Sequence, residues 1–387
     1  MGKGPLEGIR VLDVASAVAG PWASTQLADA GADVIFIEKV DTPDVMRMSG
    51  AAAGDQTGAW VAMHRNKRAM ALNLRDERAR AVVHQLAVQT DIFIQNYRPG
   101  VADRLGIGYD DLSAINPDII YVSISGVGAT GPDSDQPVYD PIIQALAGMT
   151  EAQGGDHMKT VVADKTTAMT AANAALAALV ARANGAGGQH VELNLLDSML
   201  NWAWLDCYWN LAMPDAPPVP TYSDWYVPYD TSDGQIAAIW TSLQQYASAA
   251  RAVGRADLVD DPRFATRALR LQNADAQRAE FTAALAKMTT TEAIESLKAH
   301  DVPCAPVLSR EQVIDHPQVV HNGTIIEMEN PNGGRSRTIR PPARFAKTPT
   351  EVSSHAPGWS EHTDEILAEL GLDAATIESY RTGGVTR

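Results

Sequence analysis

Cysteine is scarce in this chain of 387 residues, which contains only two, Cys207 and Cys304. Two thiols exclude a framework of several disulfides and a metal site built mainly from cysteine. Such scarcity is typical of a reducing compartment, so we expect a cytoplasmic protein without a bound metal. No apolar run is long enough to span a bilayer, and the first residues, MGKGPLEG, lack the apolar core of a signal peptide. We therefore expect no membrane partner.

Positive charge is also scarce, because 31 Lys and Arg residues face 47 Asp and Glu residues and the net charge is −16. An acidic protein repels nucleic acids and anionic membranes, so neither is an expected partner. The exception is the segment 39–104, where ten basic residues outnumber seven acidic ones. A local positive region on an acidic protein suits a small ligand that carries phosphate groups.

Strand-like and helix-like segments alternate through the first half of the chain. The expected strands are 10–14, 33–40, 69–74, 92–96, 119–124 and 189–195, and the expected helices are 22–30, 76–89, 109–115, 140–149 and 166–182. This alternation predicts an α/β fold, with a mostly parallel, Rossmann-like sheet that helices cover on both faces.

Two stretches rich in proline and glycine interrupt this pattern and are expected to be linkers. They are 213–224 and 330–345. The sequence thus predicts a large domain over 1–212, a smaller α+β domain over 225–329, and a last segment over 346–387.

One carboxylate, Asp164, lies at the start of the alanine-rich segment 166–182. Ala, Leu and Met dominate this segment, and Asn184-Gly185 is a typical helix stop. A side chain at a helix start faces unpaired N–H groups and the positive end of the helix dipole, which favours its ionised form. Taken alone, the segment favours a simple N-cap role for Asp164.

Further motifs stand in order around this carboxylate. They are PLEGIRVLDVASAVAGPWAS at 5–24, HRNKRAMALNL at 64–74, QNYRPGVADRLG at 95–106, INPDIIYVSISGVGATGP at 115–132, VYDPIIQALAGM at 138–149, DVPCAPVLS at 301–309 and GWSEHTDEILAELGL at 358–372. Together with the Asp164 segment, they resemble the family III coenzyme A transferases of the CaiB/BaiF type, the formyl-CoA and carnitine-CoA transferase group. The resemblance covers nearly the whole chain.

This resemblance implies a CoA-transferase that moves coenzyme A from an acyl-CoA donor to a free carboxylic acid acceptor. Asp164 would be the nucleophile and would form aspartyl anhydride and aspartyl-CoA thioester intermediates. Coenzyme A would be a substrate, and no permanently bound cofactor is implied. The resemblance further implies that 346–387 rejoins the large domain and that two subunits interlock like linked rings in a homodimer.

The resemblance also implies roles for other residues. The residues expected to bind coenzyme A are Lys39, Lys67, Asn96, Tyr97, Arg98 and Arg104. Developing oxyanions need hydrogen-bond donors, and backbone N–H groups are the natural supply. The candidates for that role are Val18, Ala19, Gly126 and Gly128.

Three alternatives stay open. The first is an α-methylacyl-CoA racemase of the same fold, which needs a histidine just before the aspartate that matches Asp140, where this chain has Tyr139. The second is an acyl-CoA-binding protein without catalysis. The third is a dinucleotide oxidoreductase, suggested by Glu38 at a strand end, although the glycine-rich segment 126–131 runs into PDSDQP rather than into a helix.

Overall fold

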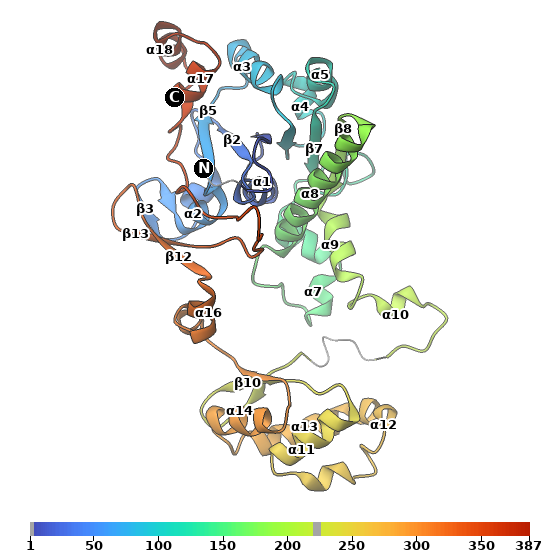
Figure 1. Ribbon diagram of the computed structural model, residues 1–387. Helices are drawn as coiled ribbons and strands as arrows, with labels where there is room; N and C mark the ends of the chain where they lie inside the picture. The colour runs from blue at the N-terminus through green and yellow to red at the C-terminus, as the bar shows by residue number, and fades with distance from the viewer. Residues whose placement is uncertain (1–3, 220–225) are drawn as a thin grey trace. The chain divides into compact units, whose positions relative to one another are not determined.

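The computed structural model describes residues 4–219 and 226–387 (Figure 1). The chain divides into two compact units, one of Met1–Trp204 with Val320–Arg387 and one of Leu205–Val319. The domain limits expected from the sequence stay predictions, and the expected linker 213–224 extends into 220–225, outside the described residues.

A six-stranded parallel sheet forms the centre of the first unit. Its strands are β1 (Arg10–Asp13), β2 (Asp33–Glu38), β5 (Lys67–Ala71), β6 (Ile92–Gln95), β7 (Ile120–Ser125) and β8 (Gln189–Asn194). They lie in the order β5-β2-β1-β6-β7-β8, and every neighbouring pair is parallel. Continuous apolar strands such as β6, whose residues are all buried, are typical of a sheet covered on both faces. The predicted α/β fold with a parallel sheet is confirmed.

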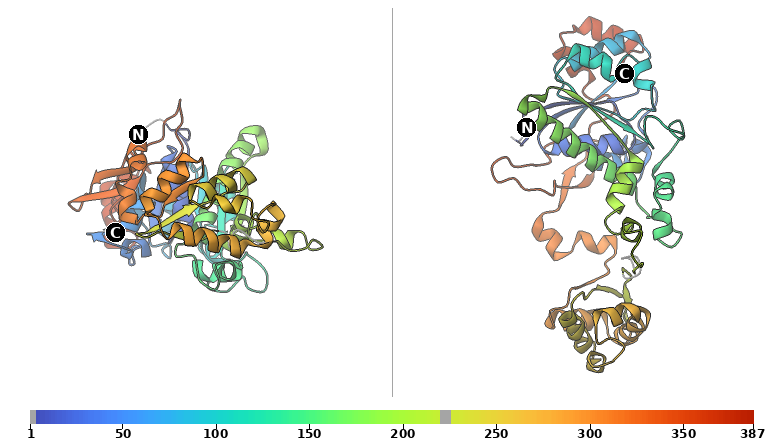
Figure 2. Two further views of the ribbon diagram at one scale, coloured as in Figure 1. Left: turned by 90° about the horizontal axis from the view of Figure 1, so that it is seen from below. Right: turned by 90° about the vertical axis from the view of Figure 1, so that its right-hand side faces the viewer.

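Helices cover both faces of this sheet (Figure 2). One face carries α1 (Ala19–Asp29) and α8 (Val162–Ala181), which contact each other, and α8 also contacts α9 (Leu195–Ala203). The other face carries α3 (Glu77–Ala87), α5 (Tyr109–Ile115), α17 (Thr363–Glu369) and α18 (Ala374–Thr382), whose apolar side chains share one core with Leu12 and Ile35. Segments from both ends of the chain therefore build the same layer.

Shorter elements complete the first unit. They are η1 (Val45–Met48), α2 (Gly58–His64), α4 (Val101–Arg104), α6 (Asp140–Leu146), α7 (Met149–Ala152), the strand pair β3 (Ala52–Ala53) and β4 (Gln56–Thr57), and the antiparallel pair β12 (Ile325–Glu329) and β13 (Arg335–Ile339). The helix α16 (Pro317–Asn322) contains the point where the two units meet in the chain.

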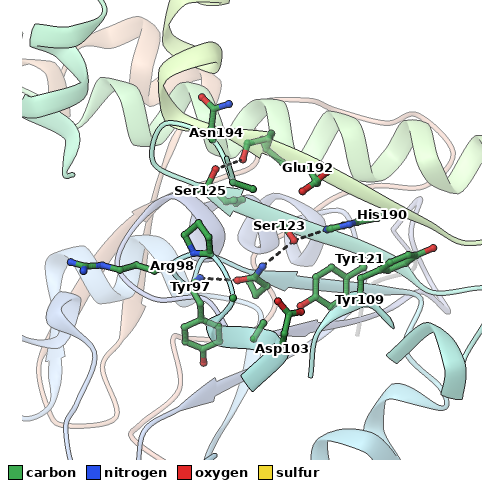
Figure 3. A pocket seen from close by; sticks show the side chains of 18 of the residues that line it. Tyr97, Arg98, Asp103, Tyr109, Tyr121, Ser123, Ser125, His190, Glu192 and Asn194 are labelled. Atoms are coloured by element: carbon green, nitrogen blue, oxygen red, sulfur yellow. Dashed lines mark hydrogen bonds between the residues drawn. The ribbon is translucent and has the colours of Figure 1, made fainter. Parts of the chain in front are cut away.

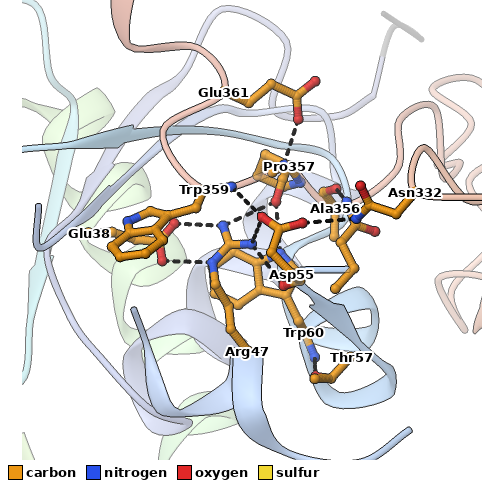
Figure 4. Close-up of polar contacts among 12 residues, drawn as sticks. Glu38, Arg47, Asp55, Thr57, Trp60, Asn332, Ala356, Pro357, Trp359 and Glu361 are labelled. Atoms are coloured by element: carbon orange, nitrogen blue, oxygen red, sulfur yellow. Dashed lines mark hydrogen bonds and ion pairs between the residues drawn. The ribbon is translucent and has the colours of Figure 1, made fainter. Parts of the chain in front are cut away.

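A buried network around Arg47 fastens the C-terminal segment to the first sixty residues (Figure 4). Arg47 donates to both carboxylate oxygens of Glu38, at 2.9 and 2.7 Å, and its guanidinium lies 3.5 Å from the ring centroid of Trp60. Both Arg47 and the Trp60 indole donate to the carbonyl oxygen of Pro357, at 3.2 and 2.8 Å. The return of the chain to the first unit is thus fixed by hydrogen bonds as well as by apolar packing.

The second unit has its own apolar core, which includes Tyr246, Phe264 and Phe281. Its strands β9 (Tyr229–Asp230), β10 (Gln235–Ala238) and β11 (Cys304–Pro306) form an antiparallel sheet in the order β11-β10-β9. Its helices are α10 (Trp209–Ala212), α11 (Leu243–Ala252), α12 (Arg267–Gln272), α13 (Ala274–Leu285), α14 (Thr290–Ala299) and α15 (Arg310–Ile314), with the short turn η4 (Ala256–Val259). Across the two described stretches, no helix is both long enough and apolar enough to cross a bilayer.

Candidate active site

The strand order reverses between β1 and β6. From β1 the chain continues to β2 and β5 on one side, and the later strands β6, β7 and β8 follow on the other. In open parallel sheets, ligands bind where the strand order reverses in this way, beside the loops that leave the carboxyl ends. Here those loops are 14–18 and 96–100. We therefore expect a ligand-binding site at this edge of the sheet.

Asp164 lies in the first turn of α8, which begins at Val162, four residues before the expected start. Its side chain makes no N-cap hydrogen bond. The simple N-cap role suggested by the sequence is therefore wrong, and the half-buried carboxylate remains available for another task.

Asp140, the first residue of α6, supplies the cap instead. One of its carboxylate oxygens accepts hydrogen bonds from the backbone N–H groups of Ala163, at 2.7 Å, and Asp164, at 3.2 Å. Sequence reasoning missed this contact, because a cap from another helix leaves no local pattern before α8. The available signal was the Asp-Pro start of α6, which places a carboxylate at a helix entrance.

The pKa of Asp164 differs from the sequence-based expectation that the helix terminus would keep it ionised. Its pKa is raised to about 7, mainly by burial of the carboxyl group and also by the negative charge of Asp140, while a backbone hydrogen bond from Ala19 opposes the increase. Desolvation thus outweighs the helix terminus. Asp164 therefore changes its charge near neutral pH, where an ionised carboxylate is both available and reactive.

The turn before α1 is held in place by Asn96. The side chain of Asn96 accepts from the backbone N–H of Ser16, at 2.9 Å, and donates to the carbonyl oxygen of Ser16, at 2.7 Å. Ala17 has a positive φ of 61° and donates its N–H to Asp44. The next residues are Val18, which precedes α1, and Ala19, its first residue. Asn96 thus positions the turn whose Ala19 amide acts on Asp164.

The glycines of the loop after β7 have structural reasons of their own. A Cβ at Gly126 would lie 2.2 Å from a methyl group of Val138. The carbonyl oxygen of Gly126 accepts hydrogen bonds from the first backbone N–H groups of α9. Gly128 has a φ of +122°, which favours glycine. Of the four proposed oxyanion donors, Ala19 is the one with a hydrogen bond to Asp164.

A pocket of about 560 Å³ lies against β6, β7 and β8 and is also lined by the start of α5 (Figure 3). Tyr97 and Arg98 lie on its wall. Its floor carries a hydrogen-bonded row in which Gln95 donates to Ser123 at 2.9 Å and Ser123 contacts His190 at 2.8 Å. Pockets of this size are typical of sites for small molecules.

The expected cationic ligands for phosphate separate into two groups. Lys39, Arg98 and Arg104 are exposed and lie beside the carboxyl ends of β2 and β6. Lys67 is fully buried: its ammonium donates to the carbonyl oxygen of Pro21 at 2.7 Å and lies 3.6 Å from the carboxylate of Asp13. Burial lowers the pKa of Lys67 to about 8. The location of Lys67 thus argues against the expected coenzyme A contact, because its charged group has no exposed surface.

The structure removes the observation that suggested a dinucleotide oxidoreductase. Glu38 is buried and both of its oxygens bind Arg47, so it is not free to hold a ribose. The segment 126–139 contains no helix start of the kind that a dinucleotide fingerprint requires. Within residues 4–219 and 226–387, no cluster of three or more His, Cys, Asp or Glu side chains is arranged to hold a metal ion.

Comparisons with known proteins agree on one family. The pattern of CoA-transferase family III matches residues 6–363. An acyl-CoA transferase of Fusarium pseudograminearum is 32% identical over 99% of this chain and 88% of its own length. The succinyl-CoA:glutarate CoA-transferase of Mus musculus is 32% identical over 98% of this chain and 90% of its own.

Solved structures give the same answer for the fold. A CAIB/BAIF family protein from Brucella suis superposes with a TM-score of 0.83 at 29% identity, covering 95% of this chain and 100% of that one. The protein Rv3272 from M. tuberculosis superposes with a TM-score of 0.82 at 28% identity, covering 94% and 99%. The protein described here belongs to CoA-transferase family III and is a CoA-transferase.

Proposed function

We propose that the protein moves coenzyme A from an acyl-CoA to a free carboxylic acid through covalent intermediates on Asp164. One observation carries the proposal. Asp164 is a half-buried carboxylate at the carboxyl edge of the sheet, and Asp140 relieves it of the capping role that its position would otherwise give it. A carboxyl group with a pKa of about 7 combines basicity with a useful ionised fraction at neutral pH.

The proposed reaction begins with two acyl transfers on Asp164. Its carboxylate oxygen attacks the carbonyl carbon of the acyl-CoA, the C–S bond breaks, and coenzyme A leaves as a thiolate. An acyl-aspartyl anhydride remains. The thiolate then attacks the Asp164 carbonyl carbon, which releases the donor acid as a carboxylate and leaves an aspartyl-CoA thioester.

The second half repeats these steps in reverse with the acceptor. The acceptor carboxylate attacks the aspartyl thioester and expels the thiolate, forming a new anhydride. Attack of the thiolate on the acceptor's carbonyl gives the new acyl-CoA and restores the Asp164 carboxylate. The energy of the thioester is conserved throughout, so no ATP is needed.

Each attack creates an oxyanion that needs a donor, and the Ala19 amide is the best-supported candidate because it already acts on Asp164. Val18, Gly126 and Gly128 remain candidates from the same two loops. The direct test is mass spectrometry of the peptide that contains Asp164 after incubation with an acyl-CoA. We expect a mass gain equal to coenzyme A minus water, and an adduct on any other residue would contradict the proposal.

The exposed cations beside the carboxyl ends of β2 and β6 are proposed to bind the phosphate groups of coenzyme A. They are Lys39, Arg98 and Arg104, with Tyr97 beside them, whereas Lys67 and Asn96 are assigned to holding the fold and the 14–18 turn. The binding of a polyanion by exposed arginines at a strand edge agrees with the local excess of positive charge in 39–104.

Replacement of Arg104 by alanine is expected to raise KM for acyl-CoA by about tenfold while kcat stays within about twofold, because the arginine contacts a part of the substrate that does not react. Steady-state kinetics with acyl-CoA and dephospho-CoA esters measure this effect. Arg251→Ala, an exposed arginine of α11, is the matched control and is expected to leave KM unchanged. A fall in kcat with an unchanged KM would contradict a phosphate contact for Arg104.

We also propose that the protein is a homodimer, as the resemblance implies. Support comes from α8, which has apolar side chains on its outer surface as well as its inner one: Met169, Leu176 and Val180 are exposed along one face. A helix that is apolar on all sides is normally covered on all sides. Light scattering is expected to give twice the 41.4 kDa of one chain, and a monomer mass would contradict the proposal. The cytoplasm, with two free thiols in the chain, remains the proposed location.

A further inference from the structure

Asp140 is a buried, hydrogen-bonded carboxylate next to the proposed nucleophile. It is 3% exposed. Its Oδ2 accepts from the backbone N–H groups of Ala163 and Asp164, and its Oδ1 accepts from the side-chain amide of Gln144 at 2.6 Å. A side chain on α6 therefore holds the main chain of the nucleophile itself.

Gln144 extends this attachment to the segment that leads into α8. Its side-chain oxygen accepts from the N–H of Met158 at 2.8 Å, and its side-chain NH₂ lies 3.2 Å from the carbonyl oxygens of both Met158 and Thr160. Asp140 and Gln144 are one helical turn apart, so both face α8. The start of α8 is thus held at two places, by a charged group and by a neutral one.

Asp140 also supplies the charge that acts on Asp164. Of the ionisable side chains in the described stretches, Asp140 is the one whose charge contributes to the shift at Asp164. Lys165, the nearest cation in sequence, binds the hydroxyl of Thr160 instead, and Asp197 of α9 bonds to Asn194. From α1, only the backbone amide of Ala19 acts on the carboxyl group.

We infer that Asp140 is a positioning residue of the transferase reaction, which fixes the main chain of Asp164 and favours the acylated state of its carboxyl group. The second effect follows from electrostatics. Two ionised carboxylates in a poorly hydrated site repel each other, and this repulsion disappears when Asp164 becomes an uncharged anhydride or thioester. This inference rests on the proposed role of Asp164 as the nucleophile.

The first test is the pH dependence of kcat/KM for the wild type and for Asp140→Asn. Asp164 must be ionised to attack, so the rate of the wild type rises with pH up to about pH 7 and then levels. Removal of the Asp140 charge lowers the pKa of Asp164, so the rising limb moves to lower pH by about one unit or more. A less basic carboxylate is a weaker nucleophile, and kcat on the plateau is expected to fall by about tenfold or more.

Gln144→Leu separates positioning from charge, because it removes the hydrogen bonds to Met158, Thr160 and Asp140 but keeps the Asp140 carboxylate. We expect its rising limb at the wild-type pH, with kcat lowered and KM for the acyl-CoA within about twofold. If Asp140 had only a role in folding, the rising limb would stay at the wild-type pH in Asp140→Asn as well. Asp140→Glu, which keeps the charge, is expected to keep the limb at the wild-type pH, so a shift seen only in Asp140→Asn is caused by the charge. If circular dichroism shows that Asp140→Asn does not fold, the kcat of Gln144→Leu decides the case, because a folded Gln144→Leu variant with the wild-type kcat would contradict the positioning role.

The inference is overturned if Asp140→Asn keeps both the wild-type limb and a kcat within about twofold, or if the limb moves by a unit or more in Asp140→Glu. Failure of the proposed function gives a different result. In that event, a variant without the Asp164 carboxylate retains transfer, whatever Asp140→Asn does.

Discussion

Asp164→Ala is expected to lose CoA transfer by a factor of about 10⁴ or more, which is the usual scale for removal of a covalent nucleophile. The other carboxylate at the start of α8, Asp140, is buried and both of its oxygens accept hydrogen bonds, and alanine cannot form an anhydride or a thioester. Alanine is also the best helix former, so α8 and its contacts to the sheet persist. Binding of acyl-CoA, which involves other residues, is expected to stay within about threefold of the wild type.

Transfer is measured by the appearance of the new acyl-CoA in a panel of donors and acids, with the same variant examined for the loss of the Asp164 adduct. The matched control is Asp364→Ala. Asp364 also lies in the first turn of a helix, α17, but it is exposed and pairs with Arg381 on the surface. The control is expected to keep wild-type turnover. Transfer by Asp164→Ala within tenfold of the wild type would show that another group carries the intermediate.

Lys67→Met is expected to lower the free energy of unfolding by about 3–5 kcal/mol, because it leaves the buried Asp13 carboxylate without its counter-charge. Asp13 and Lys67 are each 0% exposed at the side chain, and Asp13 also accepts hydrogen bonds from Ser24 and from the N–H of Ala15. The Lys67 ammonium in turn holds the carbonyl oxygen of Pro21 inside α1. Loss of one partner of such a pair costs far more than loss of an exposed ion pair.

Chemical denaturation at pH 7 measures this loss of stability. Two further variants test whether the loss comes from the unpaired buried charge. The double variant Asp13→Asn/Lys67→Met removes both charges and is expected to recover part of the stability. Lys39→Met removes an exposed lysine and is expected to change stability by less than about 0.5 kcal/mol. A stable Lys67→Met variant with a tenfold higher KM for acyl-CoA would restore the coenzyme A contact that the sequence motif predicts.

The positions of the secondary structure elements followed closely from sequence patterns. The expected helix 109–115 coincides with α5, and the expected strand 33–40 contains β2. Local signals decide such elements, because apolar periodicity, helix formers and stop residues act over a few positions. Among the expected helices of the first unit, the largest departure is α8, which begins four residues early because Asp140 supplies the cap from a distant part of the chain.

Some side-chain roles could likewise be predicted from the sequence, and others could not. The sequence predicted roles for Asp164 and for the turn that contains Ala19, and in the structure the Ala19 amide bonds to the Asp164 carboxyl group. It did not identify Asp140, and it placed Lys67 among the surface ligands although β5 directs this side chain into the core. A motif shows which residues are present, whereas burial depends on which strand neighbours and helices surround them.

The sequence by itself determined the order of the elements, the parallel α/β sheet and the identity of one carboxylate at a helix start, because each depends on short stretches of chain. Only the tertiary structure decided the charge state of that carboxylate. Its pKa depends on the water that folding removes and on Asp140, which lies 24 residues away in sequence yet bonds to its backbone N–H. Desolvation and through-space charge are properties of the folded chain, and here they decide the charge state of the proposed nucleophile.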